Sequence, residues 1–543
     1  MKRSEMLAAI EDSGTTWDVI VVGGGATGLG AALEAASRGH RTVLVESHDF
    51  AQGTSSRSTK LIHGGVRYLR QGRIGLVRQS LKERQRLLNN APHLVHTLDF
   101  VMPTYRCGAR SFYYCGMRVY DLLAGQVLSG RARSLSRNET SRSLPNLRSD
   151  GLLGGVMYGD GQFDDSRLAI SLARTAVNQG AVVANYLQVE SLIRTGSRTT
   201  GVIVRDLLSG REHSLSGRVV LNATGIFAAQ LMEHDAGYHV AAQQERKESL
   251  KVRDDAPPAI APSQGSHLVV DAEFLPGMNA LMIPETDDGR VLFAIPWHGK
   301  VLLGTTDVAV SQISRDPRPL ASETDYLLDH ADRYLQHSPQ ISDVRSMFAG
   351  LRPLVASKTL ATATASLSRE HLIHISGSGL ISVIGGKWTT YRQMGEDLIN
   401  HAELTGNLRR RQSVTSTLRL HGFPQSDHRS DFEAALKVYG SDSAGVMQLT
   451  VEDPGLATRL HSRLPYLAAE VIWAARHEMA QTIEDVLSRR TRALFLDVEA
   501  AIGSAPLVAE LMAKENQQSI AWQREQVQAF CSLAQNTYRL KSA

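Results

Sequence analysis

Residues 53–73 carry a dense set of side chains suited to chemistry, in the stretch GTSSRSTKLIHGGVRYLRQGR. Hydroxyl, ammonium, imidazole and guanidinium groups follow one another closely, and together such groups can bind an anion and hold a proton. The stretch is therefore either one wall of an active site or an exposed basic loop. The motifs elsewhere in the chain are needed to distinguish between these two interpretations.

A glycine-rich turn near the N-terminus predicts an element that such a wall could face. The sequence DVIVVGGGATGLGAALEAASRGHRTVLVE, residues 18–46, reads as strand, turn, helix and second strand. In this frame Gly23 permits the tight turn, Gly25 lets a pyrophosphate approach the backbone, and Gly28 lets the helix pack closely on the strand. The helix N-terminus favours phosphate, and Glu46 is placed to accept hydrogen bonds from ribose hydroxyls. The unit therefore predicts a dinucleotide site.

The placement of this unit favours FAD over NAD. It lies at the start of a chain of 543 residues, and no second complete GxGxxG follows, which is more typical of a permanently bound flavin. Two later turns agree with a flavin. Thr224 and Gly225 follow a buried strand, and Gly386 precedes a helix that begins near Lys387 and Thr389. A helix N-terminus beside Lys387 would stabilise negative charge on a reduced flavin ring.

The bulk composition is that of a soluble globular protein of several domains, with 42% apolar and 21% charged residues. We expect no membrane-spanning helix and no secretory signal, because no sufficiently long apolar run occurs. Three cysteines argue against a disulfide framework and for a reducing compartment. The segment from His477 has Gln481 where a zinc protease needs its second histidine, so we expect no metal site.

Positive charge is concentrated between Arg57 and Arg148. This segment holds 17 Lys or Arg against four acidic residues, whereas the net charge of the whole chain is only +4. The excess predicts an anionic partner, and we expect no nucleic acid because no nucleic-acid-binding motif accompanies the charge. The segment 70–86 interleaves leucines with cations. It is either a helix that binds anionic lipid or a core-facing helix with a solvated basic side.

Several motifs in a fixed order resemble the FAD-dependent, quinone-linked glycerol-3-phosphate dehydrogenase family. They are the N-terminal glycine unit, GTSSRSTKLIHGGVRYL, GSHLVV (265–270), FAIPWHGKVLLGTTD (293–307), AGLRPL (349–354), GGKWTTYR (385–392) and HEMAQTIEDVLSRRTR. The resemblance covers nearly all of residues 17–500. It implies a mixed α/β (α+β) fold with a Rossmann-like FAD-binding domain, a D-amino-acid-oxidase-like substrate domain and a helical C-terminal domain.

The expected division of the chain follows from this resemblance and from the helical spacing of apolar residues after position 464. The FAD-binding domain is expected at 17–84, 161–229 and 346–400, the substrate-binding domain at 85–160 and 230–345, and the helical domain at 401–543.

The family implies oxidation of sn-glycerol 3-phosphate to dihydroxyacetone phosphate by hydride transfer to flavin, with the electrons passed to quinone. It also implies a cytoplasmic protein attached peripherally to the inner face of the cytoplasmic membrane. Two alternatives stay open: a superfamily oxidase of an amine or a 2-hydroxy acid that uses oxygen, and a non-catalytic flavoprotein. A homodimer is likewise an open alternative for the assembly.

The resemblance places six side chains near the substrate: Arg67, Tyr68, His267, Arg352, Arg369 and Lys387. The reaction needs an anion clamp, a base and a stabiliser of the developing oxyanion. Arg67 and Arg369, helped by Lys387, are expected at the phosphate, because guanidinium groups bind its oxygens in pairs. His267 is then the candidate base and Arg352 the candidate stabiliser.

The remaining expectations concern the cofactor. Residues 53–60 are expected to form a wall beside the flavin, and residues 63–65 the turn that admits its ring. The expected cofactor-binding residues are Gly23, Gly25, Gly28, Glu46, Ser55, Ser56, Ser58, Lys60, His63, Gly64, Gly65, Thr224, Gly225, Gly386, Lys387 and Thr389.

Overall fold

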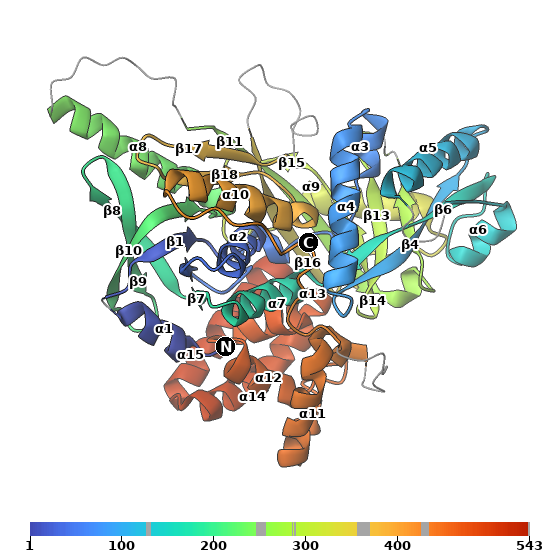
Figure 1. The fold of residues 1–543 in the computed structure, drawn as a ribbon. Helices are drawn as coiled ribbons and strands as arrows, with labels where there is room; N and C mark the ends of the chain where they lie inside the picture. Colours follow the sequence, from blue (N-terminus) through green and yellow to red (C-terminus); the bar gives the residue numbers. More distant parts are fainter. Residues whose placement is uncertain are drawn as a thin grey trace.

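The computed structural model contains two β-sheets, helices that cover them and a helical C-terminal region (Figure 1). It describes residues 1–12, 14–125, 132–245, 257–284, 286, 289–355, 370–424 and 434–540, with only the backbone described at 67, 238–245 and 434–435. None of the helices in these ranges combines the length and the apolar character that crossing a lipid bilayer requires.

The first sheet is built around the predicted glycine unit. Its strand order is β17-β18-β10-β1-β2-β7, and β1 pairs in parallel with both β2 and β10. Helix α2 connects β1 to β2 and packs against α7 and α10, which confirms the predicted strand–helix–strand unit. The elements are α1 (Arg3–Glu11), β1 (Trp17–Val22), α2 (Ala26–Ser37), β2 (Thr42–Val45), α7 (Asp165–Asn178), β7 (Val182–Ala184), β8 (Leu187–Thr195), β9 (Arg198–Asp206), β10 (Glu212–Asn222), α8 (Ala228–Glu245), β17 (Leu372–Ile375), β18 (Ile381–Ile384) and α10 (Tyr391–Thr405).

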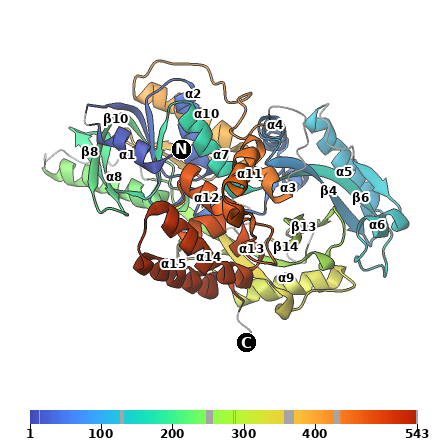
Figure 2. The same cartoon turned by 90° about the horizontal axis from the view of Figure 1, so that it is seen from below.

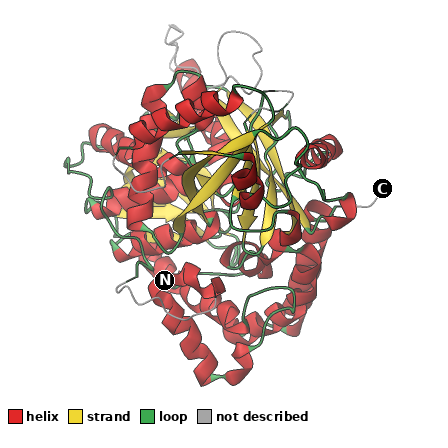
Figure 3. Cartoon of the chain, turned by 90° about the vertical axis from the view of Figure 1, so that its right-hand side faces the viewer, coloured by secondary structure: helices red, strands yellow, loops and turns green. Residues whose placement is uncertain are grey.

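The second sheet is largely antiparallel, with the order β15-β11-β14-β13-β12-β4-β6-β3, and β16 pairs with β11. Seen from the side in Figure 3, helices surround the strands. The elements are β3 (Leu61–Ile62), α3 (Val66–Arg70), α4 (Ile74–Asn90), β4 (Val95–Thr104), α5 (Ala109–Ala124), β5 (Arg133–Leu135), α6 (Arg137–Ser143), β6 (Gly154–Phe163), β11 (Ile260–Asp271), β12 (Ala280–Ile283), β13 (Leu292–Trp297), β14 (Lys300–Gly304), β15 (Val308–Ala309), α9 (Ala321–Tyr334) and β16 (Ser346–Val355).

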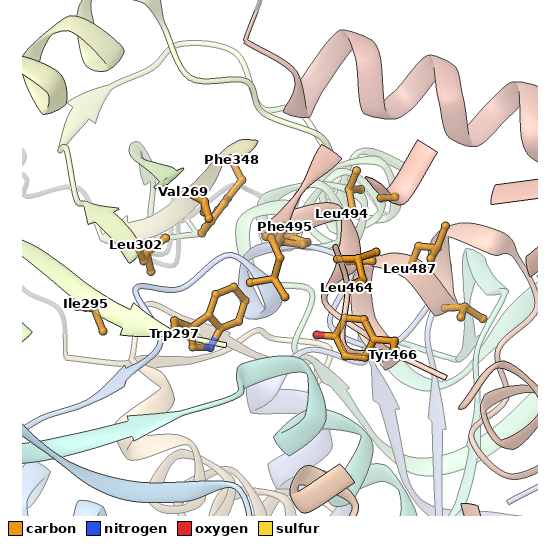
Figure 4. Packing of buried hydrophobic residues seen from close by; sticks show 14 of the residues in the cluster. Val269, Ile295, Trp297, Leu302, Phe348, Leu464, Tyr466, Leu487, Leu494 and Phe495 are labelled. Carbon is orange, nitrogen blue, oxygen red and sulfur yellow. The ribbon is translucent and has the colours of Figure 1, made fainter. Parts of the chain in front are cut away.

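The C-terminal helices form a compact group on one side of the molecule, coloured orange to red in Figure 2. They are α11 (Ser443–Glu452), α12 (Ala468–His477), α13 (Ala493–Leu496), α14 (Val498–Asn516) and α15 (Ile520–Leu533). One apolar core joins this group to the second sheet. Figure 4 shows Trp297 and Phe348 of the sheet close to Phe495 of α13. The C-terminal region is therefore packed onto the sheet through buried aromatic side chains.

The pairing of strand β16 suggests a change to one predicted domain boundary. The other boundaries stay predictions. The strand spans residues 346–355 and pairs with β11 of the second sheet along most of its length. We therefore propose that the second segment of the substrate-binding domain extends through β16, and that the last FAD-binding segment begins after it.

The basic segment that follows residue 70 forms α4, and most of its apolar side chains face the interior, whereas Ile74 at its start is exposed. Leu76, Val77, Leu81 and Leu87 are all at most 8% exposed. This burial supports the core-facing interpretation of the helix, because the apolar groups that a lipid surface would need are covered. The local positive charge is also partly compensated, since Arg84 forms a buried ion pair with an acidic residue of β6.

Candidate active site

The turn after β1 leaves room only for glycine at two of its predicted positions. Gly23 has a φ of +108°, and a Cβ there would lie 2.6 Å from the carbonyl oxygen of Ala223. A Cβ on Gly28 would lie 1.9 Å from the carbonyl oxygen of Gly23. Gly25 is the N-cap residue of α2 and has no side chain to cap the helix, and the hydroxyl of Ser55 accepts a hydrogen bond from the Ala26 N–H at 3.0 Å. The turn and the helix start thus form a cradle in which phosphates can approach the backbone.

Glu46 follows β2 directly and lies over this turn. Its Oε2 accepts a hydrogen bond from the Gly24 N–H at 2.5 Å, and its Oε1 accepts one from the His48 N–H at 2.9 Å. Burial raises the pKa of Glu46, and the two backbone hydrogen bonds oppose this rise. The carboxylate is therefore held beside the glycine turn, where the sequence predicts a contact with ribose.

A cavity of about 330 Å³ lies beside the start of α2, where residues of both sheets meet. Ala26 and Thr27 of α2 line it, so it is continuous with the glycine turn. The expected site residues that line it are Ser55, Ser58, His63, Gly65, Tyr68, Gly225, His267, Arg352, Gly386, Lys387 and Thr389. The structure thus brings the flavin-wall segment, the substrate residues and the Gly386 turn to one space.

The other expected residues lie elsewhere or are not described. Arg369 and the side chain of Arg67 fall outside the described residues, so the two arginines expected at the phosphate stay predictions. Among the residues that the structure describes, these expected residues do not line the cavity: Gly23, Gly25, Gly28, Glu46, Ser56, Lys60, Gly64 and Thr224.

His267 lies on β11 and is 2% exposed. Its ring stacks on Phe348 at 4.8 Å between centroids, and its Nε2 is 3.0 Å from the hydroxyl of Thr59. Burial lowers the pKa of His267 well below its usual 6.5, and the charges of Lys60 and Arg352 lower it further. The imidazole is therefore neutral near pH 7 and able to accept a proton.

Arg352 lies on β16, and its guanidinium is held at the cavity by polar neighbours. Its Nη2 donates to the Thr305 hydroxyl at 3.0 Å, and its Nη1 is 3.4 Å from a carboxylate oxygen of Asp307. Two glycines of the recognised motifs make the space that these functional groups occupy. A Cβ on Gly265 would lie 2.2 Å from Arg352 Nη2, and a Cβ on Gly304 would lie 2.2 Å from His267 Cδ2.

Lys387 joins two turns that are far apart in the sequence. Its Nζ lies 4.0 Å from the centroid of the Tyr68 ring, a distance suited to a cation–π contact. The His63 N–H donates to the hydroxyl of Thr389 at 3.3 Å. The predicted turns at residues 63–65 and 385–389 therefore meet at the cavity, as the flavin interpretation requires.

Lys60 has a structural environment that corrects its expected cofactor role. Its ammonium group is fully buried and donates to Asp165 Oδ2 at 2.6 Å and to the carbonyl oxygen of Ser56 at 2.7 Å. Burial lowers the pKa of Lys60 to about 7; Asp165 opposes this shift and Arg492 adds to it. Because this ammonium group is fully buried, we propose that Lys60 fixes the wall and does not itself contact the cofactor. Ser56 is likewise 2% exposed.

A buried cluster of ion pairs, which the sequence did not predict, connects the C-terminal region to the wall at residues 53–60. Arg489 and Arg490 both bind the carboxylate of Asp49, at 2.5 and 2.7 Å. Arg492 donates to the carbonyl oxygen of Ser56 at 2.9 Å and lies 3.3 Å from Asp165 Oδ1. The motif that contains these arginines was recognised, but its partners lie up to 441 positions away, and spacing cannot reveal such pairs.

Arg290, Thr305 and Asp307 also line the cavity and were missed, and Arg57 and Thr59 line it but were predicted only as part of the wall at residues 53–60. Arg57 and Thr59 belong to the segment of interest, so their residue types were available as a signal. Arg57 is mostly engaged elsewhere, because its Nη2 donates to Asp316 at 2.6 Å. Thr59 contacts His267 and is considered further below.

Comparisons with known proteins agree with this geometry. Residues 18–392 match the family model of the FAD dependent oxidoreductases, and residues 381–526 match the C-terminal domain of alpha-glycerophosphate oxidase. The fold and the glycine turn thus define an FAD-dependent oxidoreductase.

Individual relatives narrow this class. A mitochondrial glycerol-3-phosphate dehydrogenase of Rattus norvegicus is 37% identical, over 94% of this chain and 72% of the relative. Its counterpart in Arabidopsis thaliana is also 37% identical, over 94% of this chain and 85% of the relative. The structure of a glycerol-3-phosphate dehydrogenase from Bacillus halodurans complexed with FAD superposes with a TM-score of 0.78 at 29% identity, covering 98% of this chain and 97% of that one. The chain belongs to the FAD-dependent glycerol-3-phosphate dehydrogenase family.

Proposed function

We propose that this chain oxidises sn-glycerol 3-phosphate to dihydroxyacetone phosphate, with FAD as oxidant and a membrane quinone as electron acceptor. The observation that carries the proposal is the shared cavity, in which a buried neutral imidazole, His267, and the cations Arg352 and Lys387 border one space beside the glycine turn. A secondary alcohol next to a phosphate needs this combination of a base and positive charges. The relatives that are 37% identical are named for the same substrate.

FAD fits the residues that are present. Gly23 and Gly28 let the turn pack so closely that Cβ atoms there would clash with the backbone, and α2 begins at the cavity. When bound, the flavin supplies a two-electron oxidant that accepts a hydride from an alcohol carbon. We propose that the glycine turn and Glu46 hold the dinucleotide, and that Ser55 and Thr389 lie beside the ring system.

The cations that line the cavity suit the phosphate of the substrate. Lys387 and Arg290 both line the cavity, and a guanidinium group can bind two phosphate oxygens at once. We propose that these two residues bind the phosphate together with Arg67 and Arg369, which the sequence predicts there.

His267 and Arg352 act at the other end of the substrate in this proposal. His267 holds the proton of the C2 hydroxyl, because its imidazole is uncharged near pH 7 and therefore has a nitrogen lone pair for a proton. Arg352 stabilises the negative charge that develops on the C2 oxygen, since its guanidinium is already oriented toward the cavity by Thr305 and Asp307.

A second cavity supports an apolar electron acceptor. It has a volume of about 440 Å³ and lies between α3, α5 and β12, with Met102, Phe112, Met117 and Pro284 in its wall. Val66, Met282 and Val291 line both cavities, so the two spaces are separated by single side chains. An apolar quinone bound there would be adjacent to the proposed redox centre.

Helix α5 supports peripheral attachment to an anionic membrane. Phe112, Val119 and Leu122 are 66%, 46% and 80% exposed, and their spacing places them along one side of the helix. Exposed arginines lie nearby, Arg118 on α5 itself and Arg73 at the start of α4. An apolar strip beside cations fits a lipid surface with anionic headgroups. We propose that this face of α5, and not the apolar side of α4, contacts the membrane.

The membrane proposal is tested with anionic vesicles. The double variant Phe112→Ser/Leu122→Ser should lose most vesicle binding in flotation and keep its turnover with a soluble dye acceptor. Val451→Ser is the matched control, because Val451 is 72% exposed on α11, and it should bind like the wild type. Equal binding of all three proteins would exclude α5 as the membrane face.

The function itself is tested with a panel of substrates under steady-state turnover. Glycerol 3-phosphate should support reduction of a short-chain quinone, and glycerol, sarcosine and lactate should not. Rapid turnover of sarcosine or lactate with oxygen would favour the oxidase alternative, because those substrates need carboxylate recognition in place of a phosphate clamp.

A further inference from the structure

His267 lines the cavity, but one of its ring nitrogens is buried and the other already contacts a hydroxyl group. Nδ1 is buried and has no hydrogen-bond partner among the residues that the structure describes. Nε2 is engaged by Thr59 Oγ1 at 3.0 Å, and the ring face is covered by Phe348. A base in this position can receive a proton only through the group that already contacts Nε2.

Thr59 lies between His267 and the cavity. It lines the cavity, and its hydroxyl can accept one proton while it donates its own. Among the residues that the structure describes, the hydroxyl of Thr59 forms its side-chain hydrogen bond with His267 Nε2. One hydroxyl therefore contacts both the cavity and the buried imidazole.

The backbone on both sides of Thr59 is fixed by a single carboxylate. The Ser58 N–H and hydroxyl donate to Asp165 Oδ2 at 3.1 and 2.7 Å, and Lys60 Nζ donates to the same oxygen at 2.6 Å. Lys60 also has a φ of +63°, an uncommon conformation outside glycine. These contacts hold Thr59 in one orientation, which a proton relay requires.

We propose that Thr59 is a further catalytic residue, which relays the proton of the substrate C2 hydroxyl to His267. The proposal rests on the proposed function. The O–H bond of the substrate breaks and its proton bonds to Thr59 Oγ1, while the proton of Thr59 passes to His267 Nε2. The C2 hydrogen leaves with its electron pair to the flavin oxidant. Two protons are therefore in flight for each hydride transferred.

Two variants test the relay by removing and restoring the hydroxyl. Thr59→Val keeps the branched shape without the hydroxyl, and Thr59→Ser keeps the hydroxyl. In anaerobic stopped flow with saturating glycerol 3-phosphate, Thr59→Val should reduce its flavin about 100-fold more slowly than the wild type, the order of magnitude of lost acid–base catalysis. Thr59→Ser should stay within about threefold, because acid–base assistance is retained.

Affinity for the product provides a readout that does not depend on turnover. Both variants should bind dihydroxyacetone phosphate in calorimetry with the wild-type dissociation constant, because the relay acts on the proton and not on the phosphate. A Thr59→Val variant that reduces its flavin at the wild-type rate would overturn the relay. A slow variant that has also lost product binding, and that Thr59→Ser does not rescue, would overturn it too, because the residue would then be structural.

The wild type alone offers an independent test. When the rate of flavin reduction is plotted against the fraction of D₂O in the solvent, it should fall along a curve, because two protons move in the same step. A straight line would contradict the relay. A wild-type protein that glycerol 3-phosphate does not reduce at all would instead refute the proposed function. The two failures are thus distinguishable.

Discussion

Replacing Asp165 by asparagine should destabilise the protein strongly and in a pH-dependent way. Asp165 is fully buried and faces two cations, with Lys60 Nζ at 2.6 Å and Arg492 Nη2 at 3.3 Å. An amide keeps the shape of the side chain but leaves both positive charges without compensation. Removing one partner of a buried ion pair typically costs about 3–5 kcal/mol, and we expect a loss of this size at pH 6.

The pH dependence follows from Lys60. Its pKa is about 7 in the folded protein, below the value of about 10.4 that is usual in unfolded chains. Folding therefore releases a proton, and stability rises with pH above the folded pKa. Without Asp165 the pKa of Lys60 falls further, so this rise begins at lower pH in the variant. Above pH 7 Lys60 is neutral in both folded proteins. The difference in unfolding free energy between the wild type and the variant should then shrink to the part due to Arg492.

The assay is urea unfolding of the FAD-bound protein at pH 6 and pH 9, followed by tryptophan fluorescence and by flavin release. A chain of this size need not unfold in one step, so the comparison uses the transition in which both signals change together. Glu190→Gln is the matched control. It removes a partner of Arg205, but the two side chains are 33% and 44% exposed, and exposed pairs contribute at most about 1 kcal/mol.

A loss below about 1 kcal/mol at pH 6 would refute the reasoning about the buried pair. An equal loss at pH 6 and pH 9 would refute the role of Lys60. The double variant Asp165→Asn/Lys60→Met should be more stable at pH 6 than Asp165→Asn alone, because the uncompensated ammonium group is gone.

Three shorter predictions concern the site. Gly28→Ala should lose FAD on gel filtration, since its Cβ would lie 1.9 Å from the carbonyl oxygen of Gly23. The control Gly75→Ala, whose Cβ would have no atom within 4 Å, should retain FAD. Equal retention of FAD by both variants would contradict the cradle. The rate of flavin reduction should stay constant from pH 8 to below pH 6.5, because burial beside two cations lowers the pKa of His267, and a half-maximal rate near pH 6.5 would argue against that shift. Arg352→Ala should lower kcat/KM about 10²–10³-fold, as loss of an oxyanion donor does, and a change below threefold would exclude the stabilising role.

Local patterns were sufficient to predict the parts of the site that the chain forms within a few residues. The glycine turn and Glu46 belong to one short strand–helix–strand unit, so their geometry follows from the residues between them. The turn at residues 63–65 was likewise recognisable from its own glycines, and one of them, Gly65, has a φ of +83°.

Contacts between distant segments were beyond sequence reasoning. Thr59 and His267 are 208 positions apart, and no periodicity indicates that they meet. Lys60 was expected at the cofactor because it ends the predicted flavin wall at residues 53–60. Its partner Asp165 begins α7, far along the chain, and only the fold shows that the ammonium group is buried.

The two sides of a helix raise a related difficulty. Apolar residues follow similar spacings in α4 and α5, but Leu76, Leu81 and Leu87 of α4 are buried. Helix α5 buries Met117 and Tyr120 and exposes Phe112, Val119 and Leu122. Which side of such a helix faces solvent depends on the elements packed against it. Helix α4 packs mainly on α3, α5 and the turn at residues 388–390, and α5 packs on α3, α4 and β6.

A single anaerobic turnover tests the central claim most directly. The FAD-bound protein is mixed with excess glycerol 3-phosphate in the absence of any acceptor, and the flavin absorbance and the organic product are measured together. The account predicts complete bleaching with one dihydroxyacetone phosphate formed for each flavin reduced. A flavin that stays oxidised with this substrate, or that bleaches with lactate or sarcosine instead, would contradict it.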